Sequence, residues 1–404
     1  MSDLNFNKKW KLGLLLLSVT SIVTLFFFNA YQSFDEPFFI KNSELFSKYG
    51  LSKDFLLNMR LQAPGPTYQV FHFFTSSFTG YNVVWMRLIT MASLSGCIYL
   101  LGKIIASQNQ SQPANFINLA LLFFVIPTTW VYGTMAITQI PAMLCALGFA
   151  LLFNKKTSLT NSFALGILLS FSILGRAHYG AFLLFCLFDV LKNLNKEIII
   201  KNLIIFTTTV AICLPIFLVW QGYVPPDQQA AFSNSSHLHF SSVFTGSIFL
   251  FLFTSILSPI WLNRPVIRYF VIFFIITVSL NFLFDFSPYH SKVISSIFKF
   301  LPEKLISALP TPMYLTITLL TFYHYVDLES VLKLKMQGMI GLIIVATILS
   351  GLRSTQFSDG YVFQVLPLII MFNYEKISSK WFVPKYLLMA SLGFIYLLHR
   401  MMII

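Results

Sequence analysis

Residues 21–46 read SIVTLFFFNAYQSFDEPFFIKNSELF, an apolar run that leads through a short polar connection into two adjacent acids and a second apolar-rich segment. The run belongs to a longer apolar stretch with lysines in front of it and no clean small-residue cleavage site behind it. This pattern favours a retained first membrane span, which begins on the cytoplasmic side, over a removed signal peptide. Asp35 and Glu36 are then expected at the outer mouth of that span.

The composition of the whole chain agrees with a membrane protein. Of its 404 residues, 56% are hydrophobic and 10% are charged, whereas a soluble domain carries about 25% charged residues. The net charge of +13 is spread thinly between apolar runs, so it indicates loop topology rather than nucleic-acid binding. The runs suit helices better than the alternating strands of a barrel, and they predict an all-α, polytopic bundle of about 11–13 membrane spans.

The apolar runs can be placed in order along the chain. The candidate spans are residues 12–30, 83–102, 116–133, 135–153, 161–175, 177–191, 202–220, 241–261, 267–284, 306–326, 338–352, 360–374 and 382–400. More than half of the 27 basic residues then fall in the loops on the cytoplasmic side, as the positive-inside rule requires. The longer connections, residues 32–82, 221–240 and 285–305, are expected on the outer side.

The first outer loop combines an amphipathic segment with a tight turn. Residues 38–48 mix phenylalanine and leucine with lysine, asparagine and glutamate, a pattern typical of a helix that lies in the membrane interface. Pro64-Gly65-Pro66 predicts a turn, and an apolar helix that contains Tyr68 should follow it. We expect this loop to fold back over the acidic pair.

The acidic pair has a structural and a chemical interpretation. An ordinary role would be a solvated span end or an N-cap for the next helix. A partly desolvated carboxylate at the edge of a bilayer is also well placed to accept a proton from a hydroxyl group. Because acids are scarce in this chain, we predict a catalytic base here, with Asp35 as the first choice and Glu36 as the second.

Further polar side chains gather at the predicted outer ends of the spans. They are Tyr68, Arg176, His178, Tyr179, His237, Arg353 and Asp359. Arg176 and Arg353 are candidate phosphate ligands because a planar guanidinium group binds phosphate oxygens with two hydrogen bonds. The alternative for Arg176 is an interfacial arginine satisfied by a tyrosine, and the alternative for Arg353 is an arginine that extends from a helix end to the interface. His237 and His239 are too few for a zinc site, and the four cysteines lie in apolar runs without metal or disulfide spacing.

Taken together, these features resemble the GT-C glycosyltransferases, multi-span enzymes that use polyprenyl-phosphate sugars. FDEPFFIKNSELF at 34–46 and QAPGPTYQVFH at 62–72 are similar to the start of the eukaryotic dolichyl-phosphoglucose α-1,2-glucosyltransferase family of N-glycan assembly. GRAHYG at 175–180, SSHLHF at 235–240 and LRSTQFSDGYVFQVLP at 352–367 resemble its later segments. Pro37 stands where that family has an aliphatic residue.

The resemblance implies transfer of a hexose from a polyprenyl-phosphate donor, such as dolichyl phosphate, to an acceptor glycan, lipid or protein on the non-cytoplasmic face. Asp35 or Glu36 would take the proton of the acceptor, while Arg176 or Arg353 would neutralise the departing phosphate without a metal. His178 or His237 would donate hydrogen bonds. The site would face the periplasm of a bacterial inner membrane or, alternatively, the lumen of the endoplasmic reticulum.

The same resemblance predicts a catalytic module over residues 1–240, with the long first loop 32–82, and a transmembrane module over 241–404, joined in one structural unit. Three other functions stay open. A transporter or flippase for lipid-linked sugars would need charges along a mid-membrane path, and an O-antigen-type polymerase or ligase would concentrate its residues in a late outer loop. A non-catalytic membrane subunit would need neither charges along a mid-membrane path nor a cluster of residues in a late outer loop.

Overall fold

The computed structural model describes residues 8–28, 32, 35–62, 65–108, 115–153, 158–229, 238–258, 264–284, 310–333, 335–353, 359–377 and 382–402. Across these ranges every regular element is a helix, and none of the described residues belongs to a β-strand. The all-α prediction is therefore confirmed. Long runs of leucine, isoleucine and phenylalanine form the helices, and many turns between them fall at glycine, proline, asparagine or serine.

Three of the described helices are long and apolar enough to cross a membrane: α6 (Val83–Gln108), α12 (Lys196–Trp220) and α14 (Phe240–Leu257). Shorter apolar stretches lie in α9 (Gln139–Phe153), α10 (Leu159–Gly175), α15 (Arg264–Phe284) and α20 (Met336–Leu349). Length and composition alone define these candidates. The larger number of spans expected from the sequence stays a prediction.

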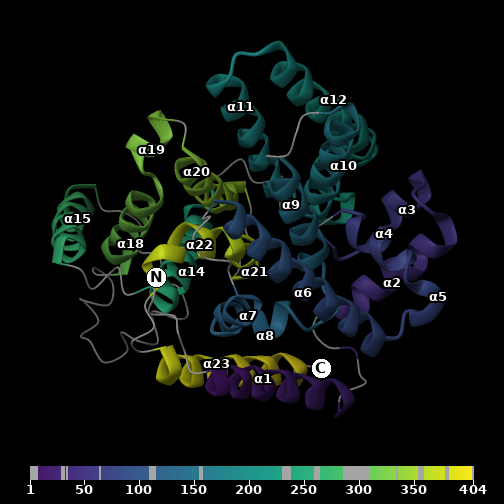
Figure 1. Ribbon diagram of the computed structural model, residues 1–404, viewed down its shortest axis with the longest axis horizontal. Helices are drawn as coiled ribbons and strands as arrows, with labels where there is room; N and C mark the ends of the chain where they lie inside the picture. Colours follow the sequence, from purple (N-terminus) through teal and green to yellow (C-terminus); the bar gives the residue numbers. More distant parts are fainter. Residues whose placement is uncertain are drawn as a thin grey trace.

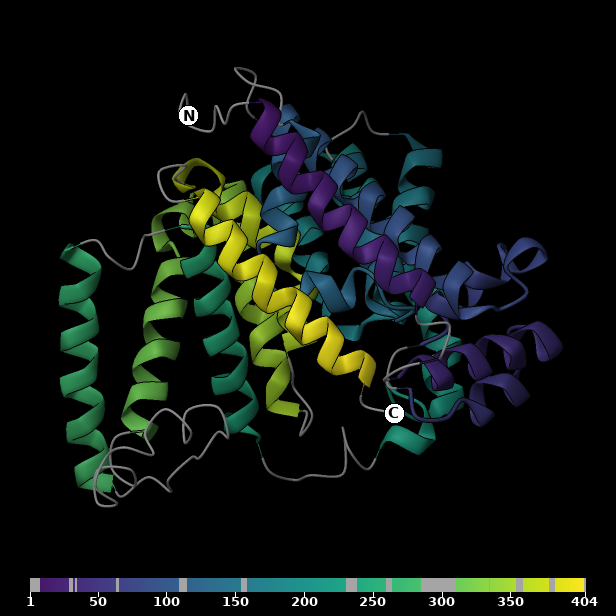
Figure 2. The same ribbon diagram turned by 90° about the horizontal axis from the view of Figure 1, so that it is seen from below.

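Helices from both halves of the chain pack into one body. In the first half, α10 packs between α9 and α12, and α9 also packs on α6. In the second half, α14 packs on α18 (Pro310–Tyr325), with α15 outermost at one side (Figures 1 and 2). α20 contacts residues 177–182, and α22 (Leu366–Asn373) contacts α6, so the predicted division near residue 240 is bridged by direct packing.

The helices α1 (Lys8–Phe28) and α23 (Phe382–Met402) lie side by side on one face of the molecule, which forms the lower edge in Figure 1 and is turned to the viewer in Figure 2. The hydroxyl groups of Ser18 and Tyr386 are hydrogen-bonded between them. α7 (Phe116–Phe124) and α8 (Thr129–Tyr132) lie against this pair, since α1 packs on α7 and α23 packs on both. The first and last described helices of the chain are thus neighbours.

The described part of the first loop forms four short helices, which gather on the side opposite α15 (Figure 1). They are α2 (Glu36–Tyr49), α3 (Lys53–Asn58), α4 (Thr67–Phe73) and α5 (Ser76–Thr79). The amphipathic segment is helical as predicted, but its apolar face, including Phe39 and Phe46, is covered by α3 and α4. The large apolar side chains that remain exposed here include Phe74 and Phe78.

Three predicted spans are interrupted in the described part of the chain. The sequence indicates a proline-broken span near Pro127, whereas continuous helices over 177–191 and 360–374 were wrong. The span 116–133 divides into α7 and α8 beside Pro127, while the span 177–191 begins as the 3₁₀-helix η2 (Ala177–Phe182) before α11 (Leu183–Lys192). The span 360–374 divides at Val365 into α21 (Asp359–Gln364) and α22. Proline lacks a backbone N–H and disfavours helical geometry in the residue before it, which accounts for the breaks beside Pro127 and Pro367.

Contacts between the ends of helices fall into two groups. In the first, the Leu61 N–H donates to Asp227 Oδ2 at 2.9 Å, and the indole N–H of Trp220 donates to the Leu56 carbonyl at 2.9 Å. The His239 N–H likewise donates to the Leu352 carbonyl at 2.9 Å. All these residues belong to connections or helix ends that the sequence assigns to the outer side.

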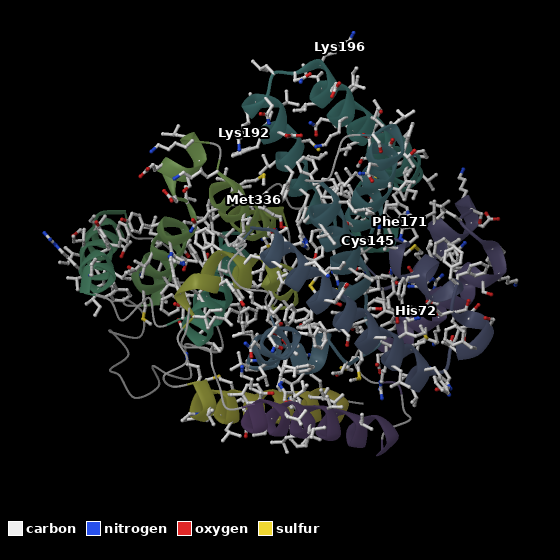
Figure 3. All side chains as sticks on the ribbon, in the orientation of Figure 1. His72, Cys145, Phe171, Lys192, Lys196 and Met336 are labelled. Atoms are coloured by element: carbon white, nitrogen blue, oxygen red, sulfur yellow. The ribbon has the colours of Figure 1, made fainter. Side chains whose placement is uncertain are left out.

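The second group joins helix ends that the sequence assigns to the cytoplasmic side. Lys201 Nζ donates to Asp189 Oδ2 at 2.8 Å and to the Phe153 carbonyl at 3.2 Å. Lys385 Nζ donates to the Ile256 carbonyl at 2.7 Å. Lys192 and Lys196 also lie at the α11–α12 turn, far from His72 of α4 (Figure 3). Loops assigned to one side therefore contact one another.

Candidate functional site

Asp35 stands directly before α2, yet its side chain does not cap that helix. The backbone at Asp35 is itself helical, with φ −88° and ψ −2°, and within the fully described helix α2 its carboxylate accepts no capping hydrogen bond. The backbone carbonyl of Asp35 instead accepts from the N–H groups of Phe38 and Phe39, at 3.1 and 3.3 Å. The carboxylate is thus left for other partners.

The electrostatic surroundings of Asp35 are mixed. Burial raises the pKa of its carboxyl group above the ordinary value of 3.8, and the positive charges of Arg176 and then Arg400 act in the opposite direction. Arg176 follows α10, and Arg400 lies in the last turns of α23. Two guanidinium groups from distant parts of the chain therefore act on one partly buried acid.

Arg176 is held in place mainly by neutral groups. Its Nη2 donates to the Thr138 hydroxyl at 2.7 Å, and its guanidinium carbon lies 5.7 Å from the centroid of the Tyr361 ring. Among the described residues no carboxylate lies within 4.0 Å of Arg176, and its Nε has no hydrogen-bond partner. A partly buried cation with these contacts is suited to an anionic ligand.

The 3₁₀-helix η2 connects Arg176 to α21. The Tyr179 hydroxyl donates to the Gln364 carbonyl at 2.8 Å, and the Tyr179 side chain is buried. The His178 ring lies between Tyr179 and Tyr361, with centroid distances of 4.7 and 6.1 Å. Its Nε2 has no hydrogen-bond partner in the described part of the chain. Arg176, His178 and Tyr179 thus all contact residues of α21 (Asp359–Gln364).

Asp359 begins α21 and is buried with both carboxylate oxygens engaged. Oδ1 accepts from the Tyr132 hydroxyl at 2.9 Å, and Oδ2 accepts from the Tyr396 hydroxyl at 3.0 Å. A Cβ at Gly360 would lie 2.9 Å from Cζ of Tyr132, so a glycine there permits the close approach. The Tyr396 hydroxyl in turn accepts from Nε and Nη2 of Arg400, at 3.3 and 3.1 Å.

Glu36 occupies a different environment from its neighbour. Its side chain is fully buried and binds Arg87 of α6 through two hydrogen bonds, from Nε to Oε1 at 2.8 Å and from Nη2 to Oε2 at 2.6 Å. Oε1 also accepts from the Ala136 N–H at 2.8 Å. The pair joins the start of α2 to α6 and to the connection between α8 and α9.

Tyr68 lies on the Glu36 side of this region. Its buried ring contacts Phe39 and His72, with centroid distances of 5.8 and 4.3 Å. Burial, and then the Glu36 carboxylate, raises the pKa of Tyr68 well above its ordinary value. Tyr68 therefore lies within electrostatic range of the Glu36 carboxylate.

The structure brings five of the residues selected from the sequence into one region: Asp35, Arg176, His178, Tyr179 and Asp359. Glu36 and Tyr68 form the adjoining buried group. His237 lies outside the described residues. Arg353 ends the 3₁₀-helix η6 (Ser350–Arg353), and its side chain also lies outside the described part.

Sequence reasoning missed Arg87, Tyr132, Tyr396 and Arg400. Arg87 carried a usable signal, since a lone charge within an apolar span is usually functional or paired. Arg400 had the pattern of an ordinary cation at a helix end. The two tyrosines carried no signal, because tyrosine is common where a membrane helix meets water.

The cysteines occupy the positions expected of small core residues. Cys97, Cys186 and Cys213 are buried and Cys145 is partly buried, and all four are free thiols. Within the described ranges, no group of three or more histidine, cysteine, aspartate or glutamate side chains is arranged to hold a metal ion.

No family model, curated protein or solved structure matches this chain.

Proposed function

We propose that this protein is a multi-pass membrane glycosyltransferase of the GT-C type, which transfers a hexose from a polyprenyl-phosphate sugar to a hydroxyl group of an acceptor glycan, lipid or protein. The supporting observation is that Asp35 and Arg176 lie within electrostatic range of each other. The first is an acid with a raised pKa, and the second is a partly buried cation with no carboxylate within 4.0 Å among the described residues. A base and a phosphate ligand are the two groups that this transfer needs.

In the proposed reaction the acceptor hydroxyl attacks the anomeric carbon of the donor. Its oxygen forms a bond to that carbon as the bond from the carbon to the phosphate oxygen breaks. The acceptor proton passes to the carboxylate of Asp35, and the electron pair of the broken bond stays on the phosphate. Arg176 stabilises the negative charge that develops on the departing lipid monophosphate.

Glu36 takes a positioning role in this proposal. Both of its carboxylate oxygens are engaged by Arg87, and one also by the Ala136 N–H, so it is poorly placed to accept a proton from a substrate. Its fixed position holds the start of α2 and the backbone of Asp35. The adjacent acids are therefore unequal, with Asp35 as the base.

The membrane topology in this proposal has the N-terminal lysines in the cytoplasm and the Asp35 region on the outer side. It is supported by the apolar helices and by the two groups of contacts between helix ends. A polyprenyl tail can then stay in lipid while its sugar phosphate meets the protein at the interface. The outer side would be the periplasm of a bacterial inner membrane or the lumen of the endoplasmic reticulum.

Sugar transfer by the purified protein in detergent tests this proposal. A panel of polyprenyl-phosphate hexoses would be offered with hydroxyl-bearing acceptors, and product formation followed by mass spectrometry. We expect Asp35→Asn to lower turnover by about 10²–10⁴-fold, the usual effect of losing a general base. Asp54→Asn is the matched control, since Asp54 is an exposed acid in the same loop.

Near-normal turnover of Asp35→Asn would remove Asp35 as the base. No transfer with any donor, together with movement of a lipid-linked sugar across liposomes that contain the protein, would instead favour the flippase alternative.

A further inference from the structure

Helix α23 is fixed against the rest of the molecule along its length. Near its start, Tyr386 is hydrogen-bonded to Ser18 of α1. At its middle, Gly393 packs directly on the indole of Trp130 in α8, where a larger residue would collide with the ring. Leu397 is buried beyond that point. These contacts hold Arg400, in the last turns of α23, within electrostatic range of Asp35.

Arg400 is joined to the site by a chain of hydrogen bonds. It donates to the Tyr396 hydroxyl, which donates to Asp359, and Tyr132 donates to the other oxygen of Asp359. An arginine and a tyrosine four residues apart often meet on a helix surface. Here, however, the tyrosine hydroxyl also binds a buried carboxylate from another helix, so the position of Arg400 is set by α21 and α8 as well as by α23.

The charged side chains around this series of hydrogen bonds are close to balance before any substrate binds. Asp35 and Asp359 face the positive charges of Arg176 and Arg400. In the reaction proposed above, Asp35 loses its negative charge by taking up a proton, while the phosphate changes from a diester with one charge to a monoester with about 1.5 to 2 charges at pH 7. Negative charge thus moves from the acid to the phosphate, and a second cation nearby stabilises it.

We infer that Arg400 is a second phosphate-binding residue, positioned by Tyr396 and Asp359, which together with Arg176 holds the lipid monophosphate product. The inference rests on the proposed function. It makes α23 part of the functional site as well as part of the helical body. It also gives Asp359 a structural reason to be at the site, since its buried carboxylate anchors the tyrosine that orients Arg400.

Binding of a short lipid phosphate tests this inference without a transfer assay. The full-length protein in detergent would be titrated with farnesyl monophosphate and, separately, with farnesol, and binding followed by thermophoresis and by the shift in melting temperature. We expect the wild type to bind the monophosphate more tightly than the alcohol. Arg400→Gln should weaken monophosphate binding by about 10- to 100-fold, the range for hydrogen bonds to charged groups, and leave farnesol binding unchanged.

Three further variants separate a binding role from a structural one. Arg400→Lys keeps the charge and should retain part of the affinity. Tyr396→Phe should lower it, because Arg400 then loses its acceptor. His399→Ala is the matched control, since His399 is the exposed neighbour of Arg400 on the same helix, and it should behave as the wild type.

The outcomes distinguish the inference from the proposed function. If the wild type prefers the monophosphate and Arg400→Gln does so equally well, the role of Arg400 is overturned while the glycosyltransferase proposal stands. If the wild type binds both ligands equally, both proposals fail. If Arg400→Gln and Arg400→Lys lose farnesol and monophosphate binding alike, in step with a lower melting temperature, Arg400 is structural and the inference is overturned.

Discussion

Asp35 holds a carboxylate where burial disfavours its charge. Because its pKa is raised in the folded protein, the ionised form is less favourable there than in the unfolded chain. A neutral isostere removes this unfavourable contribution. We therefore expect Asp35→Asn to keep or raise the melting temperature in detergent while it lowers turnover by about 10²–10⁴-fold. A drop of several degrees, with Asp54→Asn unchanged, would instead assign Asp35 a structural role.

The pH dependence of transfer should report the same carboxyl group. A base must be ionised, so kcat/KM should fall as pH falls through the pKa of Asp35, which lies above 3.8. The positive charge of Arg176 lowers this pKa, and Arg176→Gln should therefore move the acid limb of the profile to higher pH. The free energy of unfolding should change in the opposite direction. Because the pKa of Asp35 is raised in the folded protein, its protonation favours the folded state, and this contribution is lost as pH rises through that pKa. An acid limb that Arg176→Gln leaves in place would argue against the pairing of these groups.

At the scale of the element, the Glu36–Arg87 pair joins α2, α6 and the connection before α9. Removing one partner of a buried ion pair leaves an uncompensated charge and costs about 3–5 kcal/mol. We expect Arg87→Met to lower the free energy of unfolding by that amount. The double variant Glu36→Leu/Arg87→Met should recover much of the loss, because a well-packed apolar pair can replace a buried ion pair. Denaturant unfolding of the wild type and these two variants measures this.

An Arg87→Met effect of about 1 kcal/mol or less would place this pair with ordinary surface ion pairs. Equal destabilisation in the single and double variants would show that the cavity, rather than the unpaired charge, dominates.

Much of the helical layout follows from the apolar runs, and the amphipathic pattern after Asp35 correctly predicts α2. The break between α7 and α8 does not follow from hydropathy. There the Thr129 hydroxyl and the Trp130 indole N–H donate to the carbonyls of Phe123 and Phe124, at 2.6 and 2.9 Å. These side chains satisfy backbone groups that an interrupted helix leaves without partners. Hydropathy averaged over the length of a span treats residues 116–133 as one apolar run, so it cannot reveal these hydrogen bonds.

At the scale of the whole molecule, the proposed topology makes a directional prediction. In right-side-out vesicles, a membrane-impermeant thiol reagent should label Asp54→Cys but not Lys196→Cys, and inverted vesicles should give the reverse. The native thiols are buried or partly buried in apolar helices, so background labelling should be low. Labelling of both positions from the same side would overturn the alternating spans.

The long-range contacts of the site were the least predictable feature. Tyr132 and Asp359 are separated by 227 residues in sequence, and Arg87 and Glu36 by 51. The predicted topology alone places the polar residues at the outer ends of spans on one side of the membrane. Arg176, His178 and Asp359 were selected in this way. Which of them contact one another depends on how the helices pack, and a single sequence carries no direct record of that.

The adjacency of α1 and α23 has a consequence for the timing of biosynthesis. Asp35 leaves the ribosome soon after the first helix, whereas Arg400 follows hundreds of residues later. A nascent chain therefore carries Asp35, and later Arg176, before the second guanidinium group has been made. Until α23 has been inserted against α1 and α8, a newly made molecule would hold lipid phosphate poorly, so the order of synthesis itself would delay activity until the helical body is assembled.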